Sequence, residues 1–145
     1  MLGLACIKVD RGIVLTENVA YIVNVKSGLS ADSGVIIRFS CPNLKAYMAC
    51  IAELYLLDAE GKRIPREAWT VTFADSEEIT YGNRAADKSF DLQESTYWST
   101  AYGVPFPHSI VIDLGGQYEI SGLQYLPRME SSVPGALKDF RIHTR

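Results

Sequence analysis

The sequence predicts an all-β fold, an antiparallel β-sandwich. Short segments rich in β-branched and aromatic residues recur along the chain, several of them alternate apolar and polar residues, and helical periodicity is weak. Turn residues separate these segments, which is typical of a sandwich or barrel. The chain has 145 residues, 48% of them apolar, which suits one domain with a buried core.

The first predicted strands are three short apolar runs, at residues 21–25, 35–39 and 52–57. Residues of these types fit a pleated, half-buried surface, which favours extended structure. Residues 58–61, with the sequence DAEG, read as the turn that follows the third run. We expect residues 1–19 to be an N-terminal segment without an assigned role, and residues 20–145 to form the sandwich.

The next predicted strand covers residues 69–73, where alternation places Trp69, Val71 and Phe73 on one face. Residues 75–108 then form a long connection with few apolar repeats. Loops of that length inside a compact domain are usually functional or held by an ion. We therefore expect the chemistry of this chain to lie in that connection.

The clearest strand is predicted at residues 109–114, which alternate strictly and end at a pair of glycines. A further strand is predicted at 118–126, where Gly122 interrupts the alternation and indicates a bulge. The last is predicted at 137–144.

Charge and composition exclude some partners. The net charge is −3, and the 14 lysines and arginines are scattered, so no cationic surface for nucleic acid is expected. No apolar run of about 18 residues is present, so no transmembrane segment is expected. Small residues before Cys6 resemble a lipoprotein cleavage site, and the N-terminus reads either as a truncated leader or as an ordinary chain start. Cys41 and Cys50 either form a disulfide or are buried free thiols.

Motifs for catalysis are missing from the sequence. His108 and His143 are the only histidines, and neither lies in a zinc-binding spacing. Asp75, Glu77 and Glu78 are close together, but glycosidase carboxylates must flank a bond across a cleft. We expect this acidic cluster to be solvated charge and the chain not to be an enzyme.

A calcium site is one of two interpretations of residues 89–98. Asp91, Thr96 and several turn carbonyls lie within this short loop. Closely spaced oxygen ligands suit Ca²⁺, which accepts six to eight of them in flexible geometry. The alternative is a solvated turn without a metal.

Several stretches of the sequence resemble the factor 5/8 type C (discoidin-like) family. They are Phe90-Asp91 with Thr96-x-Trp98-x-Thr100, PHSIVIDLG at 107–115, ISGLQYLPR at 120–128, and Lys138-Asp139-Phe140. The sequence is especially similar to the bacterial modules appended to glycoside hydrolases, carbohydrate-binding module family 32 (CBM32). The resemblance implies a galactose-binding-domain-like jelly roll.

The order of the segments departs from the family. Residues 48–57 resemble the last strand of the family, yet they precede the signature. Either the domain is circularly permuted, with residues 20–57 supplying the final strands, or the chain spans the end of one module and the start of another. Permutation is physically plausible because domain termini often lie close together.

The resemblance also implies a structural Ca²⁺ site. Its side-chain ligands would be Asp91, Thr96 and Glu53, with backbone oxygens near Ser89 and Gln93. Leu92 stands where the family usually has a glycine, which serves a left-handed turn that leucine adopts poorly.

The family's sugar site uses a histidine, an arginine, an asparagine and an aromatic platform. Arg128 corresponds to the arginine, while Ser99 stands at the histidine position and Val133 near the asparagine. The aromatic position falls near Tyr47 or Met48. Because two of four positions differ, we expect galactose to bind poorly, and an acidic sugar to suit Arg128 better.

Other candidate ligand residues are Tyr102, Phe106 and His108, which precede a predicted strand and either rebuild the sugar site or pack the loop. Trp69 and Trp98 are expected in the core.

The resemblance implies a lectin-like, non-catalytic carbohydrate-binding module whose partner is a glycan. A parent glycoside hydrolase or other modules would be further partners, in a secreted, periplasmic or cell-surface location. Two alternatives stay open: a protein- or lipid-adhesion domain of the discoidin type, and a structural spacer of a multimodular glycoside hydrolase.

Overall fold

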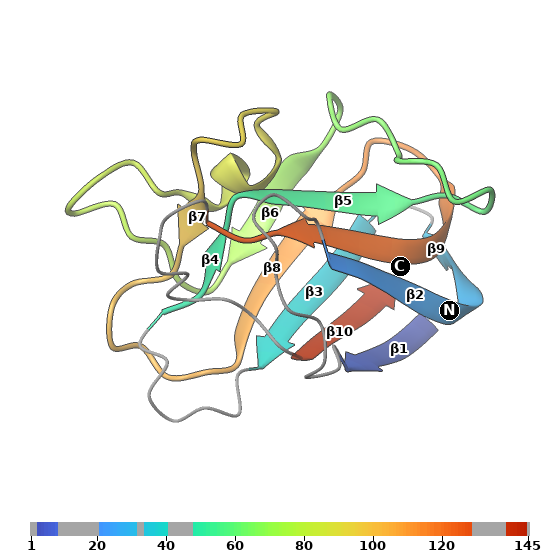
Figure 1. The fold of residues 1–145 in the computed structure, drawn as a ribbon, viewed down its shortest axis with the longest axis horizontal. Coiled ribbons are helices and arrows are strands. Elements are labelled where there is room, and N and C mark those ends of the chain that lie inside the picture. Colours follow the sequence, from blue (N-terminus) through green and yellow to red (C-terminus); the bar gives the residue numbers. More distant parts are fainter. Residues whose placement is uncertain (1–2, 9–20, 32–33, 41–47, 129–138, 145) are drawn as a thin grey trace.

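The computed structural model describes residues 3–8, 21–31, 34–40, 48–128 and 139–144, and the fold is all-β (Figure 1). Its elements in chain order are β1 (Gly3–Lys8), β2 (Tyr21–Ala31), β3 (Gly34–Ser40), β4 (Cys50–Ile51), β5 (Glu53–Leu57), β6 (Thr70–Ala74), the short 3₁₀ helix η1 (Ala86–Phe90), β7 (Trp98–Ser99), β8 (His108–Asp113), β9 (Tyr118–Leu126) and β10 (Asp139–Thr144).

Two antiparallel sheets form the sandwich. One has five strands in the order β1-β10-β3-β8-β6, and the other has three in the order β2-β9-β5. β4 and β7 form a separate two-stranded pair. Figure 1 shows the two layers crossing one above the other, with long loops at the end that carries β4 and β7.

Strands from both ends of the sequence share these sheets. β3 lies between β8 and β10, with Ile37 opposite both Ile110 and Ile142. β5 pairs with β9 along its whole length, so that Glu53 lies opposite Leu126 and Leu57 lies opposite Gly122. β1, within the segment to which the sequence assigned no role, pairs with β10 at the edge of the larger sheet.

The alternation predicted for two strands is present as predicted. β8 alternates buried and half-buried residues, and Ile110 and Ile112 are fully buried. β9 has the predicted bounds, and its partner β2 breaks register between Asn24 and Leu29, opposite Gly122 and Ile120. The predicted irregularity at Gly122 is therefore real, but the extra residues belong to β2.

The prediction for Phe73 was wrong. Trp69 is buried, but the side chain of Phe73 is 54% exposed. The pairing with β8 shifts between Val71 and Phe73, so Phe73 lies opposite Val111 and Ala74 lies opposite the buried Ile110. This bulge inverts the alternation of β6 after Val71, because one extra residue moves the following side chains to the other face.

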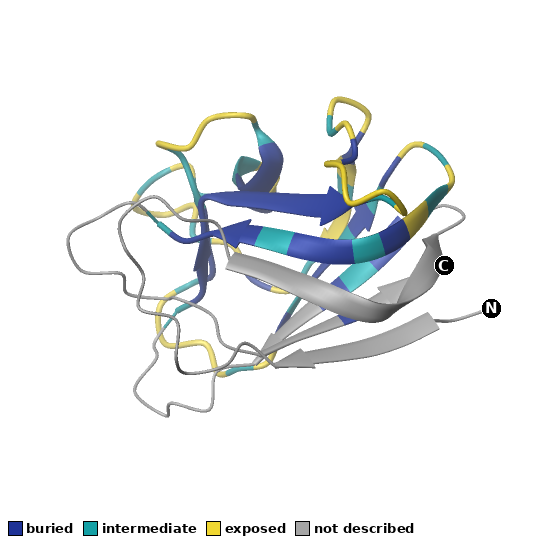
Figure 2. Ribbon diagram, turned by 45° about the vertical axis from the view of Figure 1, so that its right-hand side comes forward, coloured by how far each residue is buried: buried dark blue, intermediate teal, exposed yellow. Residues whose placement is uncertain are grey.

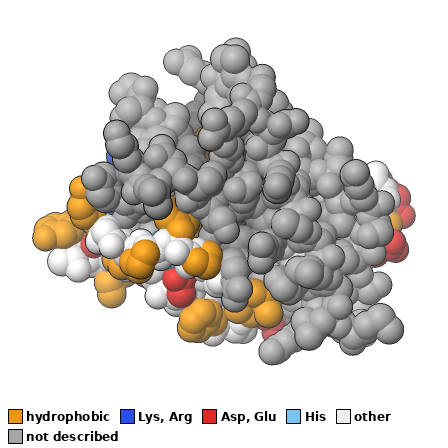
Figure 3. Space-filling model, turned by 90° about the horizontal axis from the view of Figure 1, so that it is seen from below, with side chains coloured by type: hydrophobic (Ala, Val, Ile, Leu, Met, Phe, Trp, Pro, Cys, Tyr) orange, Lys and Arg blue, Asp and Glu red, His pale blue; other side chains and the backbone are white. Residues whose placement is uncertain are grey.

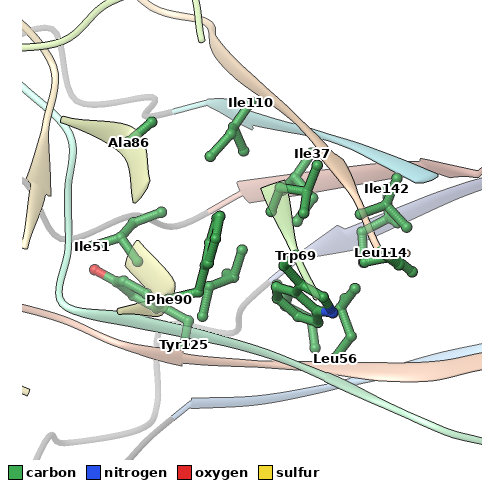
Figure 4. Close-up of a cluster of buried hydrophobic side chains, with 14 of the residues drawn as sticks. Ile37, Ile51, Leu56, Trp69, Ala86, Phe90, Ile110, Leu114, Tyr125 and Ile142 are labelled. Carbon is green, nitrogen blue, oxygen red and sulfur yellow. The ribbon is translucent and has the colours of Figure 1, made fainter. Parts of the chain in front are cut away.

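The core fills the space between the two sheets (Figures 2 and 4). Trp98 is fully buried and Trp69 nearly so, as predicted, and the Trp69 and Phe90 rings meet edge to face at 5.6 Å. Cys50 is a buried free thiol, which is the second of the two sequence interpretations. No helix in the described part of the chain is long and apolar enough to span a membrane.

Candidate functional site

The β4–β7 pair anchors the loops at one end of the sandwich. Cys50 lies opposite Ser99, and the N–H of Ala49 donates to Thr100 Oγ1 at 2.8 Å while the N–H of Thr100 donates to the Ala49 carbonyl at 2.9 Å. These bonds hold Met48 beside the segment that follows β7. Residues about fifty positions apart in the sequence are thus fixed side by side.

Buried Ser76 fixes the next loop. Its carbonyl accepts the indole N–H of Trp98 at 3.0 Å, and its hydroxyl accepts the N–H of Ala101 at 2.9 Å. Ser76 therefore holds the segment that leads to Tyr102 at two points, the Trp98 indole and the Ala101 backbone.

Residues 78–84 form a small closed loop that docks on β7. Glu78 and Arg84 form a bridge, in which the N–H of Arg84 donates to the Glu78 carbonyl at 3.1 Å. Ser99 holds both ends, because its carbonyl accepts the N–H of Glu78 at 2.8 Å and its N–H donates to the Arg84 carbonyl at 3.2 Å. The tip of this loop bears Tyr81, whose exposed fraction is 87%.

A pocket of about 280 Å³ lies between these loops. Among the described residues, its lining combines two exposed tyrosines, two charged side chains, two buried hydroxyl residues and a thioether: Tyr81, Tyr102, Glu78, Arg84, Ser99, Thr100 and Met48. Because backbone hydrogen bonds fix the segments that carry them, the pocket is formed before any ligand arrives.

Two arginines lie against one tyrosine beside the pocket. The guanidinium carbons of Arg84 and Arg128 are each 4.9 Å from the centroid of the Tyr97 ring. Burial raises the pKa of the nearby Cys50 thiol, while the Ser99 hydroxyl, Arg128 and Arg84 act in the opposite direction. Positive charge from both arginines thus acts at Cys50, which lies opposite Ser99 in the β4–β7 pair.

Exposed apolar side chains lie close in sequence to the lining residues Glu78 and Tyr102. Ile79 is 70% exposed, Tyr102 is 68% exposed, and Val104 is also exposed. In Figure 3 hydrophobic side chains gather toward the left, the side on which the loops around β7 lie in Figure 1.

The predicted metal loop follows η1 and is tightly turned. Asp91 Oδ1 accepts the N–H of Gln93 at 3.0 Å, and Asp91 Oδ2 accepts the Thr96 hydroxyl at 2.5 Å. Leu92 adopts a positive φ of 66°, the left-handed conformation expected at the position where the family has a glycine. Ser89, near the end of η1, is buried, and its hydroxyl donates to the Ala86 carbonyl.

Glu53 brings a second carboxylate to this loop. It is fully buried, its Oε2 pairs with Arg66, and its Oε1 has no hydrogen-bond partner among the described residues. Burial raises the pKa of Glu53, Arg66 lowers it, and the neighbouring Asp91 carboxylate raises it further. Glu53 Oε1 is buried, accepts no hydrogen bond from the described residues and has the Asp91 carboxylate as a neighbour. Negative charge at this place is therefore not fully compensated.

The sequence comparison agrees with this architecture. Residues 71–145 match the F5/8 type C domain family, and this match covers more than half of the chain. The chain belongs to the F5/8 type C domain family. The strands outside the matched segment, β1 to β5, pair with strands inside it.

Curated relatives of this F5/8 type C domain include two kinds of enzyme. A sialidase of Micromonospora viridifaciens is 37% identical over 79 residues, which are 52% of this chain and 12% of the sialidase. A galactose oxidase of Gibberella zeae is 34% identical over 79 residues, 52% of this chain and 11% of the oxidase. The F5/8 type C domain therefore corresponds to a small part of each of these relatives.

The predicted ligand residues of the F5/8 type C domain separate into three groups. Ser99 and Tyr102 line the pocket, and Arg128 lies beside it against Tyr97. Phe106 and His108 do not line it. Tyr47, like Val133 at the asparagine position, lies outside the described residues.

His108 is held in the interior. It has no exposed surface, its Nδ1 lies 2.9 Å from Asp75 Oδ2, and the Phe106 ring meets it edge to face at 4.7 Å. Phe106 is half-buried and packs against the core. Of the two interpretations that the sequence left open for this pair, their surroundings favour loop packing.

The sequence predicted that the acidic cluster Asp75, Glu77 and Glu78 is solvated charge. In the structure its carboxylates also accept backbone hydrogen bonds. Asp75 also accepts the N–H of Ser109 at 2.8 Å, Glu77 accepts that of Ala86 at 2.7 Å, and Glu78 Oε1 accepts those of Thr80 and Tyr81 at 2.8 and 3.0 Å. Each acid thus stabilises a turn of the long connection, because a carboxylate accepts backbone N–H groups strongly.

Sequence reasoning missed three pocket residues, Glu78, Tyr81 and Arg84. Glu78 was assigned to solvated charge, and the other two were not assigned. One signal was present: Tyr81-Gly82-Asn83 is a turn-forming stretch within a long connection, which is where an exposed tip is expected.

Proposed function

We propose that this F5/8 type C domain is a non-catalytic carbohydrate-binding module that holds a glycan in the pocket between residues 78–84 and 99–102. F5/8 type C domains commonly bind carbohydrates. The observation that carries the proposal is the preformed pocket of about 280 Å³ with two exposed tyrosines at its mouth. Pockets for small ligands are typically roughly 300–1,000 Å³, so this one suits about one sugar ring.

The chemistry of the lining fits a sugar. A tyrosine ring gives a rigid apolar surface for the C–H face of a pyranose at a low cost in conformational entropy. Glu78 and Arg84 supply an acceptor and a donor for hydroxyl groups, which fix orientation. With an open site of this size, affinity is expected to be weak.

Matched tyrosine and phenylalanine variants test the proposal. Tyr81→Ala and Tyr102→Ala should each weaken glycan binding in isothermal titration, while Phe73→Ala, which removes an exposed aromatic outside the pocket lining, should leave it unchanged. If all three variants bind glycan with equal affinity, the glycan does not bind in this pocket.

Adhesion to a lipid surface is a second candidate, which the exposed Ile79 and Val104 favour. Isolated apolar side chains on loop tips are ordinary on protein surfaces, whereas a pocket with aromatic walls and a few polar groups is the usual form of a small-ligand site. Sedimentation with phosphatidylserine vesicles separates the two: binding to vesicles that Ile79→Ser abolishes, without any glycan binding, would favour the lipid surface.

We also propose that the loop after η1 holds a structural Ca²⁺. The ligands would be the side chains of Asp91, Thr96 and Glu53 with the backbone oxygens of Ser89 and Gln93. The unpartnered Glu53 Oε1 and the adjacent Asp91 carboxylate support this, because oxygen donors with unmet negative charge suit a hard cation. Bound Ca²⁺ would tie β5 to the loop after η1.

The relatives supply a setting for this function. Both named relatives are enzymes much longer than this chain, and the shared segment is a small fraction of each. We propose that the domain works beside a carbohydrate-active catalytic domain in a secreted, periplasmic or cell-surface setting, where it holds that partner close to a glycan.

A further inference from the structure

We infer that the pocket selects an acidic glycan, with Arg84 as the residue that binds the sugar carboxylate. This inference rests on the proposed function, since it names the class of sugar for the same pocket. It assigns the principal ionic contact to Arg84, a pocket residue that the family resemblance did not indicate.

The first step is the state of the Arg84 side chain. Arg84 is half-buried, lines the pocket, and forms no ion pair within the part of the chain that the structure describes. Its backbone is fixed on both sides, by Glu78 and Ser99, and its guanidinium lies against Tyr97. A planar guanidinium held in this way keeps donors available in a fixed fork, and a carboxylate matches that fork with two parallel hydrogen bonds.

The second step is the charge around the pocket. Arg128 lies against the same tyrosine ring and adds a second cation beside the pocket. Both arginines act on the buried Cys50 in the direction expected for positive potential, after the larger effect of its burial. An anion entering beside Ser99 therefore meets the field of two guanidinium groups.

The third step concerns Glu78, the one carboxylate residue among the described residues of the lining. Its Oε1 already accepts two backbone N–H groups from its own turn, so much of its charge is directed to those donors. It remains an acceptor for hydroxyl groups of the same sugar. A neutral sugar would use the tyrosines, Glu78 and hydroxyl contacts to Arg84, while a uronic or sialic acid adds the two-pronged ionic contact to the Arg84 guanidinium.

The experiment compares sugars that differ only in the acid group. Isothermal titration of the whole chain uses methyl β-galactoside with methyl β-galacturonide, methyl β-glucoside with methyl β-glucuronide, and lactose with 3′-sialyllactose. For at least one pair the acidic member should bind roughly tenfold or more tightly, which is the scale of a charge-assisted contact.

Variants assign the difference to Arg84. Arg84→Gln should remove the preference for the acid, while Arg84→Lys, which keeps the charge but not the fork, should keep a part of it. The matched control is Arg63→Gln, because Arg63 bonds Gln124 and stacks on Tyr55 outside the pocket lining, and it should change nothing.

Salt dependence supplies a readout that needs no variant and so covers the case in which Arg84→Gln fails to fold. Affinity for the acid should fall steeply between low and high salt, while that for the neutral partner should stay constant. If neutral sugars bind and the acids bind no better, or if the acid preference survives Arg84→Gln, the inference is overturned while the glycan function stands. If none of the sugars binds at any salt concentration, both are overturned.

Discussion

The guanidinium carbon of Arg84 lies 4.9 Å from the centroid of the Tyr97 ring, at the wall of the pocket. A cation over an aromatic face is attracted by the ring and is also limited in its rotamers. Less side-chain entropy is therefore lost when a ligand binds, which matters most for a small open site. This contact holds a loop arginine in position as a hydrogen-bond donor, and the bond from the Ser99 N–H to the Arg84 carbonyl brings the segments of Arg84 and Tyr97 together.

Replacing Arg128 tests the second cation of the site. Arg128→Ala should weaken the binding of an acidic glycan by less than Arg84→Gln does, because Arg128 lies against Tyr97 beside the pocket and acts on the ligand through its charge. Arg128→Lys should lie between the wild type and the alanine variant. Isothermal titration beside thermal melting decides the matter: a variant that melts several degrees lower yet binds glycan normally would make Arg128 a structural residue only.

Removing calcium tests the loop after η1. Chelation with EDTA should lower the melting temperature, and Ca²⁺ should restore it better than Mg²⁺, because the loop offers irregular oxygen geometry. At a free Ca²⁺ concentration about 100 times Kd, the gain is about 2.7 kcal/mol, or several degrees. Asp91→Asn should abolish this effect, whereas the exposed Asp87→Asn in the same segment should not. Unchanged melting in EDTA would mean that Asp91 and Thr96 form a turn without a metal.

The raised pKa of Glu53 predicts a direction for the pH dependence in EDTA. The unfolded chain releases this proton near the ordinary value of 4.5, while the folded protein keeps it to higher pH. The protonated group therefore adds stability below the ordinary value, and this contribution is lost as pH rises through the raised folded pKa. The melting temperature of the wild type minus that of Glu53→Gln should fall as pH rises from about 4.5.

Glu60→Gln, at an exposed turn, measures the effect of removing a carboxylate charge alone. With saturating Ca²⁺ the trend for Glu53 should reverse, because the cation favours the ionised carboxylate. A difference that rises with pH in EDTA would contradict the account of Glu53 as a buried acid that lacks sufficient positive charge.

Leu92→Gly tests the strain in the same loop. A non-glycine residue in the left-handed region costs about 1–2 kcal/mol, and glycine avoids that cost but loses about 0.5–1 kcal/mol of chain entropy. Because Leu92 is exposed and its φ is 66°, Leu92→Gly should raise the free energy of unfolding by roughly 0.5–1 kcal/mol. Leu92→Ala keeps the Cβ and should give no such gain. Urea unfolding measures both, and equal values would show that the backbone is not strained there.

β8 and β9 were largely predictable from sequence, and in β8 buried and half-buried residues alternate. β9 begins and ends at the predicted residues, and Ile110 and Ile112 of β8 are buried as their alternation indicates. Phe73 was mispredicted, since an extra residue in β6 shifts the register and the composition of β6 gives no sign of it.

The pocket was less predictable. Met48, Glu78 and Ser99 meet only because β4 pairs with β7 and a short loop closes onto the latter. Periodicity within a segment carries no information about which loops will meet, so Arg84 and Tyr81 could not be assigned from their own neighbourhoods. The family resemblance placed Ser99 near the sugar site, and the pocket lies there, but it did not indicate the loop 78–84.

The central claim is that the loops around Ser99 bind a glycan, and a glycan array probed with the folded chain tests it most directly. The wild type and the Phe73→Ala control should bind the same group of glycans, enriched in acidic members, and a Tyr81→Ala/Tyr102→Ala double variant with unchanged melting should bind none. Binding by the double variant at wild-type strength would contradict the claim about the pocket, and an array without any bound glycan would contradict the function itself.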